Sequence, residues 1–145
     1  MAVKPLPGDE DLPGLWEEPT AHAVLDGGAE TPAIARMVTG SFLAALSSRR
    51  PPAVPQRLDD ILLVVSELAA NAVRHAPGRI TLMLRPALAS VHITVRDTSR
   101  TAPLPLPPDR LAGGGVGWHL IRTLAEQVSV LPDVDGKEIH VFMPW

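Results

Sequence analysis

The sequence contains no cysteine, and aromatic residues make up only 3% of it. The absence of cysteine excludes a disulfide framework, a thiolate metal site and a cysteine nucleophile. No apolar run reaches the ~20 residues that a membrane span needs. The first residues, Met1 to Thr20, carry acidic residues and prolines in place of an apolar signal-peptide core. We therefore expect a cytoplasmic protein without a membrane partner.

A concentration of positive charge is also missing. The chain has 13 Lys and Arg against 16 Asp and Glu, a net charge of −3, and its basic residues are scattered. Binding to nucleic acid normally requires a basic stripe or patch, so we expect no direct nucleic-acid partner. With 145 residues, of which 46% are hydrophobic and 20% charged, the chain has the size and composition of one globular domain.

The hydrophobic pattern divides the chain into a flexible leader, residues 1–20, and a domain, residues 21–145. A Thr31 cap followed by Pro32 predicts a helix that ends before Pro51. The other expected elements are a strand at Ala21–Leu25, a helix at Gln56–His75, strands at Ile80–Arg85 and Val91–Arg96, a helix from Val116 to about Gln127, and strands at Val128–Leu131 and Glu138–Met143. This order predicts an α+β fold, a two-layer α/β sandwich with helices on one face of a mixed, mainly antiparallel sheet.

Glu67, Asn71 and His75 recur every four residues in the second predicted helix. This spacing places them on one face, next to the apolar stripe. An asparagine oxygen suits Mg²⁺, and a glutamate can act as a base or order a metal-bound water. Spacing alone favours the alternative, which is the solvated polar edge of an amphipathic helix.

Two further segments could bind a ligand. Asp97 ends a predicted strand, where its carboxylate could accept a hydrogen bond from an exocyclic amine or could simply form a turn. The run Gly113–Gly117 precedes the third predicted helix, whose N-terminus would offer free N–H groups to phosphate. The alternative for this run is a hinge. The loop from Thr98 to Gly115 is rich in proline and glycine, and loops of this length are usually functional or disordered.

Taken together and in this order, the three features resemble the ATP-binding fold shared by gyrase B, the Hsp90 chaperone, histidine kinases and MutL. The segment Leu63 to Ala76 is similar to the asparagine box of that family nearly position by position. The other motifs follow in order, with Val95–Ser99 resembling the first glycine box, Gly115–Ile121 the second, and Gly136–Val141 the closing strand. Short single-domain members related to bacterial anti-sigma-factor serine/threonine kinases are the most similar.

The resemblance implies ATP and Mg²⁺ as cofactors. Asn71 would be the Mg²⁺ ligand and Glu67 the catalytic base. Cofactor-binding roles would fall to the remaining motif residues, namely His75, Asp97, Ser99, Gly115, Gly117 and Trp118. Asp97 would bind the adenine amine, while Gly115 and Gly117 would hold phosphates. The implied partners are a sigma factor and an anti-sigma-factor antagonist, and a homodimer is compatible with the resemblance.

Two positions depart from the family pattern. Ser99 stands where the first glycine box usually has glycine, and Glu138 stands roughly where the last strand often has threonine near the adenine. Three hypotheses follow. The chain is a serine/threonine kinase that sequesters a sigma factor and phosphorylates an antagonist, a non-catalytic regulator that only sequesters a partner, or the detached catalytic part of a histidine kinase.

Overall fold

The computed structural model describes residues 17–76, 78–100 and 115–145. Most of the predicted leader and most of the loop from Thr98 to Gly115 lie outside these residues. The elements follow the order β1 (Ala21–Leu25), α1 (Thr31–Arg49), α2 (Gln56–His75), β2 (Ile80–Ala87), β3 (Ser90–Asp97), α3 (Gly115–Leu124), β4 (Gln127–Pro132) and β5 (Lys137–Pro144). None of the helices in the described part of the chain is long and apolar enough to cross a membrane.

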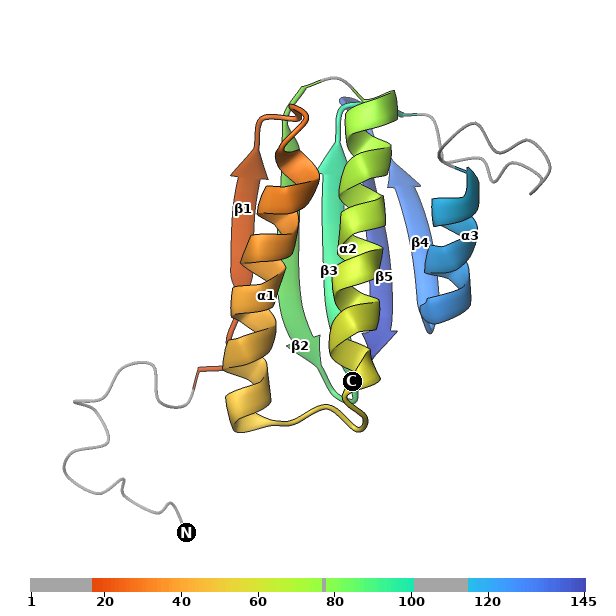
Figure 1. Cartoon of the computed structure of the whole chain (residues 1–145). Helices are drawn as coiled ribbons and strands as arrows, with labels where there is room; N and C mark the ends of the chain where they lie inside the picture. Colours follow the sequence, from red (N-terminus) through yellow and green to blue (C-terminus); the bar gives the residue numbers. More distant parts are fainter. Residues whose placement is uncertain (1–16, 77, 101–114) are drawn as a thin grey trace, which may run out of the picture.

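The five strands form one sheet in the order β1-β2-β3-β5-β4, and every neighbouring pair is antiparallel. The three helices cover one face of this sheet (Figure 1). The predicted α+β sandwich is therefore confirmed, with a sheet that is antiparallel throughout the described residues rather than mixed.

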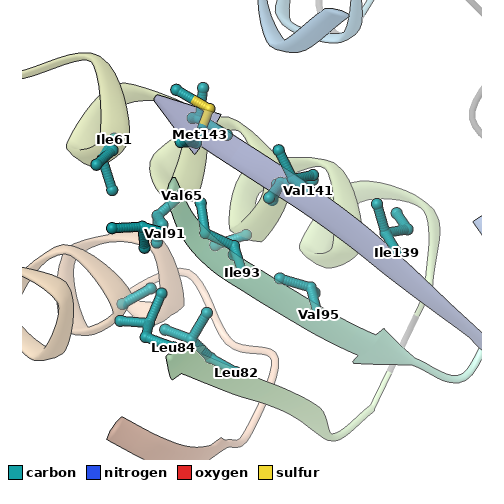
Figure 2. Close-up of a cluster of buried hydrophobic side chains, with 14 of the residues drawn as sticks. Ile61, Val65, Leu82, Leu84, Val91, Ile93, Val95, Ile139, Val141 and Met143 are labelled. Carbon is teal, nitrogen blue, oxygen red and sulfur yellow. The ribbon is translucent and has the colours of Figure 1, made fainter. Parts of the chain in front are cut away.

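Alternation along the strands directs one side of the sheet toward the helices. The branched residues of β2, β3 and β5 on that side pack against α2, as Figure 2 shows. The fully buried residues of this apolar layer include Ile61 and Val65 of α2 and Leu84, Ile93 and Val141 of the sheet, each at most 1% exposed. This apolar layer fixes α2 over the centre of the sheet and so sets the position of the polar residues near the end of that helix.

The start of α1 differs from the prediction. Thr31 was expected to cap the helix, but it is the first helical residue and is fully buried, while Glu30 takes the cap position without a side-chain hydrogen bond. Pro32 still lies in the first turn, where its missing N–H has no intrahelical partner to lose. The assignment of the cap to Thr31 was therefore wrong by one residue.

Polar side chains on the face of the sheet away from the helices include a histidine pair. His92 Nε2 lies 2.9 Å from His140 Nδ1, and the His92 ring stacks on Phe142. Burial, with smaller contributions from the charges of His140 and Arg85, lowers the pKa of His92. His140 Nε2 in turn lies 3.0 Å from a carboxylate oxygen of Glu138. The histidine pair therefore lies on the face of the sheet opposite the buried residues that pack against α2.

Candidate functional site

The predicted site residues gather at one end of the sheet. Figure 1 shows that α2 and β3 end there, and that α3 and β5 begin there. The register pairs Asp97, the last residue of β3, with Lys137, the first residue of β5. Residues from four elements that are far apart in sequence are therefore brought to the same edge.

The Glu67 side chain, on α2, contacts the beginning of α3. A side chain at Gly117 would overlap the Glu67 carboxylate, because a Cβ built there falls on Oε2. Gly117 therefore allows the carboxylate to lie directly against the first turn of α3. Backbone N–H groups in a first helical turn have no intrahelical acceptor and attract anions. Glu67 thus lies beside the first turn of α3, the element that the resemblance assigns to phosphate.

Asn71 lies one turn beyond Glu67 on α2 and is partly exposed. Within the described residues its side-chain amide forms no hydrogen bond. His75, the last residue of α2, is exposed. The predicted row is therefore present on one helix face, with Glu67 closest to α3 and His75 at the solvent end.

Asp97 is buried and already paired. Its carboxylate accepts hydrogen bonds from Lys137 Nζ, which lies 2.9 Å from each of its two oxygens. The backbone N–H of Ser99 donates to Oδ1 at 2.9 Å. The side chains of Lys137 and Asp97 are only 4% and 2% exposed. The carboxylate that the sequence assigns to adenine is thus neutralised within the protein.

Gly136 makes this pairing possible. A Cβ at this position would overlap the backbone oxygen of Asp97 and lie 3.1 Å from the Cα atom of Thr98. Only glycine lets the start of β5 approach the end of β3 this closely. The close approach brings Lys137 next to Asp97 in the strand register.

Lys137 was not among the predicted site residues. Glu138 was expected roughly where the family often has threonine near the adenine, but it pairs with Arg96 in the register and its carboxylate contacts His140 on the opposite face. The available signal was the alternation of β5. Ile139, Val141 and Met143 are buried against the helices, so Lys137 shares their side of the strand.

A hollow of about 190 Å³ adjoins this edge, lined by Arg79, Thr81, Arg96, Asp97, Thr98 and Asp135. Arg96 in it forms a two-point ion pair with Asp133, which holds the pKa of the Asp133 carboxyl below its usual value. Although the hollow reaches Asp97, the Asp97 carboxylate remains almost wholly covered. The hollow therefore gives a ligand no direct access to that carboxylate.

Comparison with known proteins identifies the architecture. The model of the histidine kinase-like ATPase domain matches residues 30–143, which is most of the chain. The chain belongs to this family. None of the curated proteins matches the sequence.

Among solved structures, the histidine kinase-like ATPase domain described here is similar to the RsbU and RsbW domains of Rv1364c from Mycobacterium tuberculosis. The TM-score is 0.61 at 18% identity, over 87% of this chain and 33% of that one. A histidine kinase domain from the Erythrobacter litoralis EL346 blue-light activated histidine kinase gives a TM-score of 0.45 at 20% identity, over 76% of this chain and 60% of that one. The chain thus spans about a third of the length of the first of these structures, and that likeness concerns the fold.

The residues of this ATPase domain fit the phosphate and metal end of a Mg²⁺-nucleotide. Asn71 would supply an oxygen donor to Mg²⁺, and the first turn of α3, which begins beside Glu67, would offer N–H groups to phosphate. Within the described residues, no three metal-binding side chains form a preassembled cluster.

The remaining residues predicted to bind the cofactor are Trp118, Ser99 and Gly115. Trp118 is 3% exposed and belongs to the hydrophobic core, as does Ile121 one turn later. Its contact with a cofactor remains a prediction, and its burial gives it a packing role. Ser99 contributes backbone groups to the Asp97–Lys137 pair, and Gly115 is the first residue of α3.

Proposed function

We propose that this domain binds ATP with Mg²⁺ and acts in the cytoplasm as a regulator of the anti-sigma-factor serine/threonine kinase type. It would sequester a sigma factor and phosphorylate an antagonist protein. The observation that carries the proposal is the contact of the Glu67 carboxylate with Gly117. It supports the proposal because Glu67, the proposed base, lies beside the first turn of α3, the proposed phosphate-binding element, in a domain of the ATPase family.

In this proposal, Asn71 holds Mg²⁺ and the first turn of α3 binds phosphate oxygens through its N–H groups. Glu67 accepts the proton of the attacking serine or threonine hydroxyl. Phosphoryl transfer depends mainly on positioning and charge stabilisation, so few protein groups are needed. When bound, Mg²⁺ would supply neutralisation of the phosphate charge.

The Glu67→Gln variant tests the kinase step. Loss of the base is expected to lower phosphate transfer to the antagonist by about 10²–10⁴-fold, because general bases contribute on that scale. The measurement is transfer from γ-labelled ATP with Mg²⁺ to the Ser or Thr of the antagonist. ATP affinity is expected to change little.

Asp59→Asn is the matched control for that experiment, because Asp59 is an exposed carboxylate in the first turn of the same helix. It should transfer phosphate at the wild-type rate. Transfer that persists in Glu67→Gln would exclude Glu67 as the base. Transfer to a histidine would instead support the histidine-kinase alternative.

A non-catalytic regulator is the second candidate. The covered Asp97 carboxylate favours it, because the side chain predicted to bind adenine already forms an ion pair with Lys137. In that case, ATP binding or partner binding would be observed while the wild-type protein transferred no phosphate to any antagonist.

A further inference from the structure

The ammonium group of Lys137 occupies the position at which the adenine amine is predicted to meet the Asp97 carboxylate. Its Nζ atom lies 2.9 Å from both oxygens of Asp97 and 3.2 Å from the carbonyl oxygen of Ser99. All three N–H donors of the ammonium thus have an acceptor within reach. A lysine is rarely buried unless it is paired in this way.

The ammonium and the exocyclic amine of adenine are chemically equivalent toward Asp97, since each donates N–H to a carboxylate oxygen. Oδ1 already has two donors, from Lys137 and Ser99, and Oδ2 has Lys137. A carboxylate with two oxygens could accept a further hydrogen bond. The pair is nearly closed to solvent, so the adenine amine can reach Asp97 only after the groups that cover the pair move and the contact with Lys137 is broken.

We propose that Lys137 is an internal competitor for the nucleotide base and sets the nucleotide affinity of this site. The inference rests on the proposed function, in which the domain binds ATP and Asp97 binds the adenine amine. Binding exchanges a charge-assisted contact with Lys137 for a contact with a neutral amine. Because hydrogen bonds between two charged groups are the stronger ones, this exchange weakens ATP binding.

Replacing Lys137 by a neutral residue should therefore strengthen ATP binding. Lys137→Met removes the competing ammonium while keeping an unbranched side chain. We expect the affinity of the full chain for ATP with Mg²⁺ to rise by about tenfold or more, the scale of one charged hydrogen bond. Isothermal titration calorimetry measures it directly. Lys137→Gln, which keeps a neutral N–H donor for Asp97, should show a smaller rise and serves if Lys137→Met does not fold.

Arg96→Met is the charge-matched control. Arg96 precedes Asp97 but pairs with Asp133, so this variant removes one positive charge and leaves the Asp97–Lys137 contact in place. Loss of a cation near an anionic ligand should lower ATP affinity or leave it unchanged. An effect of the opposite sign in Lys137→Met therefore cannot come from net charge.

Inosine triphosphate tests whether the change in affinity arises at the nucleobase, because it carries a carbonyl oxygen in place of the adenine amine. The gain in Lys137→Met should be present for ATP and largely absent for inosine triphosphate. Wild-type protein that binds ATP as tightly as Lys137→Met, or more tightly, would overturn the competitor role while leaving the proposed function intact. Absence of ATP binding in the wild type and in both Lys137 variants would overturn the ATP-binding proposal and this inference with it.

Discussion

Replacing Asp97 by alanine is expected to lower the free energy of unfolding by about 3–5 kcal/mol, the cost of leaving one member of a buried ion pair unpaired. Lys137 would keep its buried position, with only the carbonyl oxygen of Ser99 as an acceptor among its present partners. The measurement is urea denaturation followed by circular dichroism.

The double variant Asp97→Ala/Lys137→Met separates the ion pair from the packing of the two side chains. Removing both charges eliminates the unpaired ammonium, so much of the lost stability should return. If the double variant were less stable than Asp97→Ala, the buried charge of Lys137 would not be the cause of the loss.

The Gly136→Ala variant should be destabilised by about 1–3 kcal/mol, because the added methyl group overlaps the backbone of β3 and neither strand has a flexible side chain there that could yield. Separation of β5 from β3 would also move Lys137 away from Asp97. Thermal and urea denaturation measure the loss.

Gly40→Ala is the matched control for Gly136→Ala. Gly40 lies within α1, and a Cβ at this position meets no atom within 4 Å. Alanine there should stabilise the protein by roughly 0.5–1 kcal/mol through helix propensity. Equal stability of the two alanine variants would contradict the close approach at Gly136.

Much of the fold is predictable because it depends on local periodicity. The apolar stripe of α2 and the Pro-Gly pair that follows it in the sequence locate the helix at Gln56–His75 as observed. Strand β1 also has its predicted bounds. The predicted cap at Thr31 fails because this side chain is fully buried and its hydroxyl donates to Asp26, a contact that helical periodicity does not reveal.

The site is less predictable, since it depends on contacts between distant segments. That Glu67 and Asn71 share one face of α2 follows from helical spacing, and their predicted roles come from the family resemblance. The contact of Glu67 with Gly117 requires the packing of α2 on α3. The partner of Asp97 lies on the neighbouring strand β5, which follows β3 in the sequence only after a helix and a further strand. Only the strand register identifies it as Lys137. Trp118 was assigned to ligand binding by its motif, although its spacing with Ile121 is also that of a buried helix face.

The most direct test of the account is the affinity for ATP, with and without Mg²⁺, of the wild type and of Asn71→Ala. Gln56→Ala, which removes a carboxamide from the exposed start of the same helix, is the control. We expect Mg²⁺ to tighten ATP binding in the wild type and in Gln56→Ala, and to have little effect in Asn71→Ala. If no form of the protein binds ATP, or if Mg²⁺ tightens binding equally in all three, the nucleotide site centred on Asn71 is contradicted.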